Sequence, residues 1–529
     1  MGISPPPGFD PNSPLTGIWF AVQLGVGARS APKTRRLMLL GNMRSTGTAT
    51  PEQPVQVFSP DDGTTKTGAG SELDLGLAAV FAQKKDAEVW ICPVAEGGSA
   101  VKALGVIVFA NNAGTAGVVR VVIAGQLIAE TAVAAGDTPT TIAAAVAATI
   151  NAVSSLPVTA GASTGTLTLT AKQGGPRGNE IAVQVELTTT TTTAALNGGT
   201  ASATIVRGRL GTGSGGATAG SVADSFVNAL AAIASDEWVI VAACTDQTNI
   251  NRVRDHIAQY AGIPDLRRQQ GIVALKMLDV AGANAIGVAT NSARVQIVYA
   301  RDANAANTVV DPWTPSTMVV AASVGAARLY GDGQVGGGGT VLGEITYVAA
   351  NLDGCQLGGV RAPTLIAANL LGTELASVLN SGLTPLVPSA VNPGYRQLYK
   401  SITSYCRDGS SNPTKAVHDT SKVTIPDFAA QRFTNRVRAD FPNKNLVPEP
   451  ATPRPPNTPN SVQPSMVKAA VLDEAFKMEG EDILVNVELF ADAMVVEVAP
   501  SNPGTLLGQF PIDCIDHFHA MAATVQQTG

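Results

Sequence analysis

Three glycines in one loop have the spacing of a nucleotide-binding motif. Gly331, Gly333 and Gly336 match G-x-G-x-x-G within the stretch GDGQVGGGGT. In dinucleotide-binding folds a strand enters this motif and a helix leaves it, so that the helix N-terminus faces the pyrophosphate. Here an expected helix precedes the glycines, and residues 340–349 after them have an extended pattern. The context therefore favours a loop over a dinucleotide site.

A pair of histidines near the C-terminus has the spacing of metal ligands on a strand. His517 and His519 would share one strand face, where imidazoles can bind a metal ion. Cys514 and Asp516 are the nearby residues that could add a ligand. Neither an H-E-x-x-H zinc motif nor a G-x-x-x-x-G-K-[ST] phosphate loop occurs. We therefore expect an incidental surface pair, no metal, no cofactor and no enzymatic activity.

A basic cluster could in principle bind an anion. Arg432, Arg436 and Arg438 are close in the sequence, and Asp440 and Glu449 follow them. Such a mixture of signs is more typical of a solvated face or of a contact between subunits. We predict one of these two outcomes.

The composition suits large protein contacts better than a nucleic-acid partner. The chain has 529 residues, enough for two to four domains, with 45% hydrophobic and only 14% charged residues. The net charge is -6 and the sequence contains no long basic run. The chain is therefore poorly suited to neutralise the phosphate backbone of a nucleic acid.

Cysteine usage and the N-terminus indicate a protein made and folded in a cytoplasm. The cysteines are odd in number and lack C-x-x-C spacing, which favours buried reduced thiols at Cys92, Cys244, Cys355, Cys406 and Cys514. Residues 1–14 are rich in proline and have neither the basic nor the apolar region of a signal peptide. No apolar run reaches the roughly 18 residues of a membrane span.

Strands and helices alternate in two separate parts of the chain. Residues 35–40, 70–85 and 87–94 have the patterns of a strand, a helix and a strand, with the acidic pair at 61–62 in a predicted turn. The alternation resumes with a helix from 221, a strand at 237–244, a helix capped by Asp246, strands at 271–275 and 294–299, and a helix at 316–329. This alternation predicts a mostly parallel α/β sheet.

Between these parts lies a segment of different character. Residues 101–210 are rich in Gly, Ala, Thr and Val, with short strands expected at 105–110, 118–124, 166–171 and 180–187. One helix is expected at 138–153, because Thr138 can cap it and Pro139 suits its first turn. The segment ends in a Gly-rich linker at 208–220. We predict a self-contained α+β insertion on the outside of the molecule.

The C-terminal part has an α+β pattern. A helical pattern at 427–440 is followed by a Pro-rich crossing at 448–464 and by a second helix that ends at Gly480. Alternating strands at 483–490 and 494–500 predict a hairpin around residues 491–493.

Several stretches, taken in order, resemble the tail sheath proteins of contractile-tailed bacteriophages and related contractile injection particles. They are RRLMLLG at 35–41, GAGSELDL at 68–75, AEVWICPV at 87–94, GLTPL at 382–386, KSITSY at 400–405, the helix-like stretch at 427–440 and the strands at 485–498. The glycine loop at 331–339 and the long insertion depart from the family pattern.

The resemblance implies a structural role. It implies a six-fold helical homo-oligomer around a tail tube, with baseplate and tail terminator proteins as further partners, and neither direct nucleic-acid contact nor membrane insertion. The sleeve would belong to the virion tail, assemble in the host bacterial cytoplasm, and contract to drive the tube through the target cell envelope. Family members also donate N- and C-terminal strands to sheets of neighbouring subunits.

The two ends of this chain fit such strand exchange. Large apolar residues occupy every second position of the N-terminal arm (Ile18, Phe20, Val22 and Leu24) and of the C-terminal arm (Phe510, Ile512 and Cys514). A lone strand is not stable in water, so each arm needs a sheet to join. The expected acceptor sheet carries Ile483, Val485, Val487, Leu489, Val495, Val496 and Val498.

The sequence thus predicts an α/β plus α+β multidomain subunit. Its expected parts are an N-terminal arm (1–30), a mostly parallel α/β middle domain (31–100 and 216–381), an inserted outer domain (101–215), a sheath core (382–507) and a C-terminal arm (508–529). A secreted adhesin or surface-layer protein is the alternative, favoured by the Thr- and Gly-rich insertion and the low charge. The missing signal peptide and the strand-helix alternation count against it.

Overall fold

The computed structural model describes residues 36–516, except for 95, 97, 129, 214, 222–224, 263–264, 277–278, 305–308, 331–350, 450–455 and 457. The predicted N-terminal arm, the glycine motif at 331–336 and the histidine pair at 517–519 lie outside these residues. The described chain is a mixed α/β structure with one large mixed sheet, which confirms the predicted class in outline.

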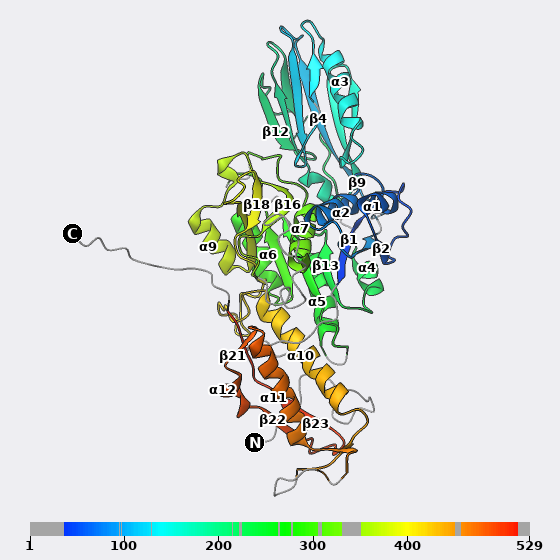
Figure 1. Cartoon of the computed structure of the whole chain (residues 1–529). Helices are drawn as coiled ribbons and strands as arrows, with labels where there is room; N and C mark the ends of the chain where they lie inside the picture. The colour runs from blue at the N-terminus through cyan, green and yellow to red at the C-terminus, as the bar shows by residue number, and fades with distance from the viewer. Residues whose placement is uncertain are drawn as a thin grey trace, which may run out of the picture.

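A nine-stranded sheet occupies the middle of the molecule (Figure 1). Its order is β16-β18-β17-β15-β14-β13-β1-β3-β2. The run from β17 to β3 is parallel, whereas β2, β16 and β18 pair antiparallel at the two edges. The strands are Arg36–Asn42 (β1), Val55–Val57 (β2), Val89–Val94 (β3), Trp238–Ala242 (β13), Gln270–Leu275 (β14), Val295–Tyr299 (β15), Gln356–Arg361 (β16), Leu383–Pro388 (β17) and Tyr395–Leu398 (β18).

Helices cover both faces of this sheet. Leu37 and Leu39 of β1 share a core with α2 and α7, whereas Met38 and Leu40 share a second core with α4 and α5. A strand covered on both faces is apolar at consecutive positions, which explains the unbroken apolar runs in β3 and β13. The helices here are Pro60–Thr67 (α1), Glu72–Gln83 (α2), Val227–Ala232 (α4), Gln247–Ala261 (α5), Val280–Thr290 (α6), Thr317–Tyr330 (α7) and Gly372–Asn380 (α9).

Side-chain caps set the first turns of several helices. Asp246 accepts a hydrogen bond from the backbone N–H of Asn249 (2.8 Å) and caps α5, as the sequence predicts. Ser59 accepts from the backbone N–H of Asp62 (3.1 Å) and caps α1. The prediction of a turn at 61–62 is therefore wrong: both acidic residues lie in the first turn of α1, where they complement the helix dipole.

Residues 102–209 form a separate unit with its own core, drawn at one end of the molecule in Figure 1. A four-stranded sheet (β11-β4-β9-β8) and a five-stranded sheet (β12-β10-β5-β6, with β7 on β5) contribute to this core together with α3. The elements are Lys102–Ala110 (β4), Gly117–Ile123 (β5), Gln126–Leu127 (β6), Thr131–Val133 (β7), Pro139–Asn151 (α3), Val158–Ser163 (β8), Thr166–Gly174 (β9), the 3-10 turn Pro176–Glu180 (η1), Ala182–Leu187 (β10), Thr193–Leu196 (β11) and Ile205–Arg209 (β12).

The C-terminal unit lies at the opposite end (Figure 1). Two long helices pack against each other and share a core with short strands. The elements are Ser421–Asp440 (α10), Asn445–Leu446 (β19), Ser461–Val462 (β20), Pro464–Gly480 (α11), Leu484–Val485 (β21), Val487–Ala491 (α12), Val495–Val498 (β22), Leu506–Gln509 (β23) and Asp513–Cys514 (β24).

The nine-stranded sheet extends further along the chain than the sequence patterns indicate. The predicted middle domain ends at 381, but Leu383 of β17 pairs parallel with Ile297 of β15, and β18 adds the next strand. Helices α6 and α9 were not predicted, because they are short or rich in Ala and Gly. Among the described helices none is both long and apolar enough to span a membrane.

Candidate assembly surface

The amino ends of the parallel strands contact the C-terminal unit. Arg294, just before β15, donates two hydrogen bonds of 2.7 Å to the carboxylate of Asp427 on α10. Asp427 is fully buried, and Arg268, just before β14, lies 3.7 Å from it. Because a bidentate guanidinium-carboxylate pair fixes both distance and orientation, α10 is held rigidly against this edge of the sheet.

The first described residue is held at the same edge. The Arg36 guanidinium lies 5.8 Å from the ring of Trp90 and 5.5 Å from that of Trp238. It also lies 3.6 Å from Glu88 and 3.3 Å from Asp236. Arg36, at the start of β1, is therefore fixed at the sheet edge that α10 also contacts.

The predicted hairpin between 483–490 and 494–500 is wrong. Leu484 pairs with Cys514 in the β21–β24 ribbon, and Val495 pairs with Gln509 in the β22–β23 ribbon. Asn486 has φ +59°, a left-handed conformation that ends the first strand and begins α12.

The predicted acceptor residues are consequently spread over several elements instead of one sheet. They lie on β21 (Val485), on α12 (Val487 and Leu489) and on β22 (Val495, Val496 and Val498), with Ile483 buried just before β21. Leu489 and Val495 are exposed, whereas Val487 is buried in the C-terminal core. The apolar residues at alternate positions of this stretch are typical of a strand. The short helix α12 forms there instead, and it also buries Val487.

The predicted C-terminal arm folds against its own unit as far as residue 516. Cys514 is buried on β24, and Phe510 and Ile512 pack against the core of α10 and α11. The Phe510 ring lies 6.0 Å from the Phe433 ring of α10. The exchange of this arm between subunits stays a prediction.

The two ribbons offer edges for strand addition. In the described part of the chain, β22 pairs with β23 alone and β21 with β24 alone. Two-stranded ribbons are marginally stable by themselves, and further strands stabilise them. The same unit exposes large apolar side chains at Phe476, Leu489 and Val495. We take β21–β24 and β22–β23, with these side chains, as the candidate assembly surface.

The predicted basic cluster is largely used inside this unit. Arg432 of α10 pairs with Glu474 and, at 2.7 Å, with Glu481. Arg436 lies 2.7 Å from Asp440 and 3.1 Å from Asp473. The pairs of Arg432 with Glu474 and of Arg436 with Asp473 join α10 to α11. Arg432 is therefore used inside the unit, whereas Arg436 and its partners Asp440 and Asp473 are partly exposed, as on the solvated face that the sequence predicts. Arg438 is exposed, and Glu449 accepts from the backbone N–H of Ser465 (3.1 Å) at the start of α11.

Sequence reasoning missed a buried charge cluster at the opposite edge of the sheet. Lys276 follows β14, and its ammonium lies 3.4 Å from Asp302, which follows β15. Asp302 also accepts a hydrogen bond of 2.5 Å from Arg209, the last residue of the inserted unit. Glu180 of that unit accepts from the Thr317 hydroxyl (2.8 Å) at the start of α7. We call Glu180, Arg209, Lys276, Asp302 and Thr317 the junction cluster.

The junction cluster is almost fully removed from water. The side chains of Arg209, Lys276 and Asp302 are 4%, 0% and 1% exposed. Burial raises the pKa of Glu180 and lowers the pKa of Lys276, whereas Asp302 opposes the shift of Lys276. The signal that could have revealed the cluster is position: polar residues directly after apolar parallel strands meet at one sheet edge.

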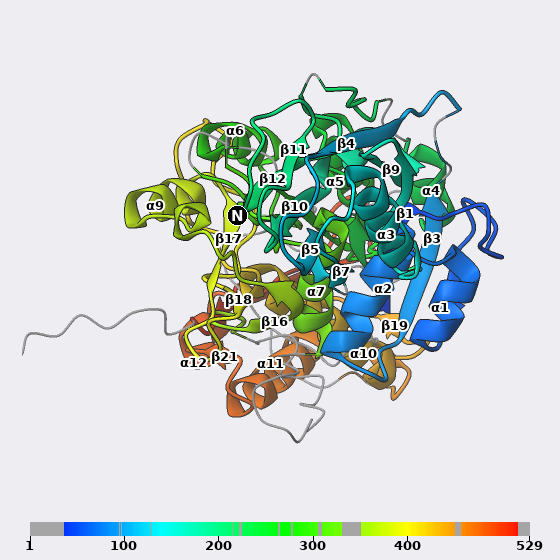
Figure 2. The same ribbon diagram turned by 90° about the horizontal axis from the view of Figure 1, so that it is seen from above.

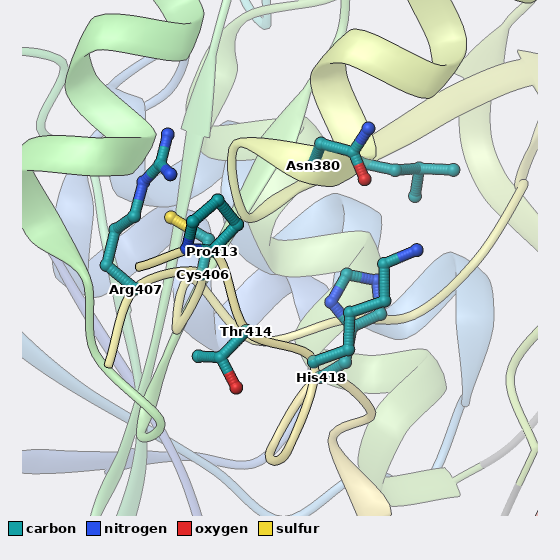
Figure 3. Close-up of a pocket in the computed structure, with 8 residues that line it drawn as sticks. Asn380, Cys406, Arg407, Pro413, Thr414 and His418 are labelled. Carbon is teal, nitrogen blue, oxygen red and sulfur yellow. The ribbon is translucent and has the colours of Figure 1, made fainter. Parts of the chain in front are cut away.

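One surface pocket of about 450 Å³ lies where α9 ends (Figure 3). It is lined by Leu379, Asn380, Cys406, Arg407, Pro413, Thr414, Lys415 and His418. Burial raises the pKa of the Cys406 thiol, so this sulfur stays protonated and is a poor nucleophile.

The remaining candidates for chemistry have structural roles. All five cysteines are buried and free, as predicted, and burial raises the pKa of Cys92 to about 12. Gly161, Ser163 and Gly165 match G-x-S-x-G, but Gly161 and Ser163 belong to β8 and Gly165 to the turn into antiparallel β9, so they do not form a strand-to-helix elbow. Within the described residues no three His, Cys, Asp or Glu side chains gather to hold a metal ion.

Comparison with known proteins identifies one related sequence. No family model matches the chain. The Mu-like prophage FluMu tail sheath protein of Haemophilus influenzae is 33% identical over 170 residues. A third of this chain is related to a tail sheath protein. The match covers 32% of the chain and 34% of that sheath protein, and it confirms the resemblance found in the sequence.

Solved sheath structures show a loose overall likeness. The sheath tail protein of Listeria innocua superposes with a TM-score of 0.47 at 13% identity, covering 93% of this chain and 94% of that one. The contracted helical sheath of the anti-feeding prophage gives 0.44 at 10% identity, covering 98% and 99%. Both TM-scores are below 0.5, so the relation to sheath proteins rests on the sequence match.

Proposed function

We propose that this chain is a structural subunit of a contractile tail sheath and not an enzyme. It would polymerise into a six-fold helical sleeve around a tail tube, with baseplate and tail terminator proteins at its ends, after assembly in a bacterial host cytoplasm. Contraction of the sleeve would drive the tube through the target cell envelope. The relation to the prophage tail sheath protein carries this proposal.

The candidate assembly surface supports the proposed mode of polymerisation. The β22–β23 ribbon is closed by a loop at 499–505 that contains Pro503. If this loop opens, the segment from Leu506 onward can make the same pairs with β22 of a neighbouring subunit. Such an exchange keeps the contacts and changes only the connecting loop, so it links subunits at little cost in contact energy.

Contraction then requires no nucleotide hydrolysis or other external source of energy. A strand joint can persist while the folded bodies that it connects rotate and repack, so one lattice can pass from an extended to a contracted arrangement. The energy would be stored at assembly and released when the more stable packing is reached. The N-terminal arm at residues 17–26 would provide a second joint of this kind.

Exchange of the C-terminal strand is testable with cysteine pairs. Val495 lies directly opposite Gln509 in the ribbon, so cysteines at these positions can form a disulfide when the two strands pair. We expect that Val495→Cys chains mixed with Gln509→Cys chains before assembly give disulfide-linked dimers on oxidation, because the two cysteines then lie on different chains. A mixture of Val495→Cys with Glu497→Cys, which share one strand, is the matched control. Sleeves that form without such dimers would disprove exchange through this strand.

A further inference from the structure

Two exposed apolar patches lie on opposite flanks of the nine-stranded sheet. Its edge strands are β2 and β16, and Figures 1 and 2 both show α1 and α9 on opposite sides of the molecule. Phe58, between β2 and α1, is 71% exposed. On the other flank Ile366, shortly before α9, is 87% exposed, and Val391, between β17 and β18, is 80% exposed.

The two residues of the second flank belong to adjoining segments. The backbone N–H of Ala362 donates to the carbonyl oxygen of Gly394 at 3.1 Å. This bond brings the segment that leads to Ile366 beside the loop that carries Val391. Ile366 and Val391 thus lie on neighbouring segments, whereas Phe58 is the one large apolar side chain exposed among the described residues of β2, α1 and the turn between them. Grouped exposed apolar side chains mark contact sites more often than isolated ones do.

Opposite charges accompany the two patches. Asp61 is exposed in the first turn of α1, three residues after Phe58. Arg361 is exposed at the end of β16, where its guanidinium lies 5.7 Å from the ring of Trp313 and 5.6 Å from that of Tyr395. Neither charge forms an ion pair with another described residue, so both are available to an external partner.

We propose that the flank with Phe58 and Asp61 packs on the flank with Arg361, Ile366 and Val391 of a second copy of this chain. The inference rests on the proposed function and identifies a contact between folded bodies, separate from the strand joints. The Phe58 flank also carries Lys66, whose ammonium lies 5.3 Å from the Phe58 ring. Lys66 pairs with Asp62, which leaves Asp61 as the charge that Arg361 of a second copy can meet. Both patches flank the same sheet. A second copy placed alongside therefore brings the two patches together.

The geometry of this contact predicts the form of the assembly. The two patches differ and lie on opposite sides, so the contact is head-to-tail. When two copies associate, each of them still has one patch free for a further copy. Such a contact closes into a ring or continues as a helix, and it does not stop at a two-fold dimer. This agrees with a sleeve and does not depend on where the arms are exchanged.

A photo-crosslinking residue at position 58 of the full-length chain tests the contact directly. In assembled protein we expect adducts between position 58 of one copy and the segment 361–391 of another. Sleeves that form and give adducts elsewhere, or give none, would overturn the contact while leaving the proposed function intact. Absence of any sleeve from the unmodified chain would instead count against the proposed function.

Charge reversal provides an independent measurement. We expect Asp61→Arg alone and Arg361→Asp alone each to raise the critical concentration for assembly several-fold at low salt, because each places like charges across the contact. The double variant restores the ion pair with the two charges exchanged. Its critical concentration should therefore be close to that of the unmodified protein. Additive losses in the double variant would show that the two residues do not meet.

Discussion

Single buried charges connect the parts of this molecule. Asp302 holds Lys276 and Arg209 at the carboxyl edge of the sheet, and Asp427 holds Arg294 and Arg268 at the amino edge. A buried ion pair contributes little net stability, because desolvation offsets the attraction. Removal of one partner is costly, however, because the remaining charge is left in a medium of low polarity. These residues therefore fix the orientation of the units that they join.

Asp302→Ala should destabilise the protein strongly. The substitution leaves Lys276 and Arg209 buried without their shared carboxylate, so we expect a loss of about 3–5 kcal/mol in the free energy of unfolding. Urea unfolding followed by circular dichroism measures it. Asp86→Ala removes the partner of Lys84 in an exposed pair and should change the free energy of unfolding by less than about 0.5 kcal/mol. Similar losses in both variants would contradict the role given to the junction cluster.

His256 should make the protein sensitive to acid. Burial lowers the pKa of His256 from 6.5 to about 4, although a hydrogen bond with Gln269 acts in the opposite direction. The stability from its neutral ring is therefore present above pH 6.5 and is lost as the pH falls from 6.5 towards 4. This shift corresponds to roughly 3 kcal/mol.

Urea unfolding at pH 7 and pH 4 can isolate this contribution. His256→Gln keeps a polar side chain that does not titrate, so we expect the variant to lose about 3 kcal/mol less than the unmodified protein between these pH values. Equal losses in the two proteins would show that His256 is not the group responsible.

At the scale of elements, local signals predicted the middle of the molecule well. The strands at 237–244 and 271–275 and the helix capped by Asp246 are present, because burial on both faces and a side-chain cap leave local marks in the sequence. The C-terminal ribbons could not be derived in this way. Leu484 pairs with Cys514 across about 30 residues, and nothing in either strand specifies a partner so distant.

Excision of the inserted unit should leave a folded and soluble remainder. The two ends of the inserted segment lie side by side, since Val101 and Ser221 exchange backbone hydrogen bonds of 3.2 and 3.3 Å. The edge that its removal exposes includes Lys276, Asp302 and Thr317, which water can solvate in place of Arg209 and Glu180. We therefore expect a chain with residues 102–220 replaced by a short Gly linker to keep its α/β circular dichroism and to polymerise.

Sedimentation of the excised protein checks this expectation. A folded remainder that stays monomeric would show that the inserted unit takes part in the lattice. Aggregation of the remainder would show that the junction is more apolar than its charged residues indicate.

At the scale of the whole molecule, the two edges of the sheet have different tasks. The carboxyl edge carries the inserted unit, whereas the amino edge carries α10 and Arg36 at the start of β1. Both attachments use buried charges, so the three units should move as one body when neighbouring copies rotate. Strand joints at the ribbons of the C-terminal unit would then act as the hinges of the lattice.

Cryo-electron microscopy of the purified full-length chain is the decisive test of the proposed sheath role. We expect the chain alone to form hollow helical sleeves with six-fold symmetry, in which the inserted unit lies outside and C-terminal strands cross between neighbouring subunits. Monodisperse monomers at concentrations where related sheaths polymerise, or sleeves in which no strand passes between subunits, would contradict it.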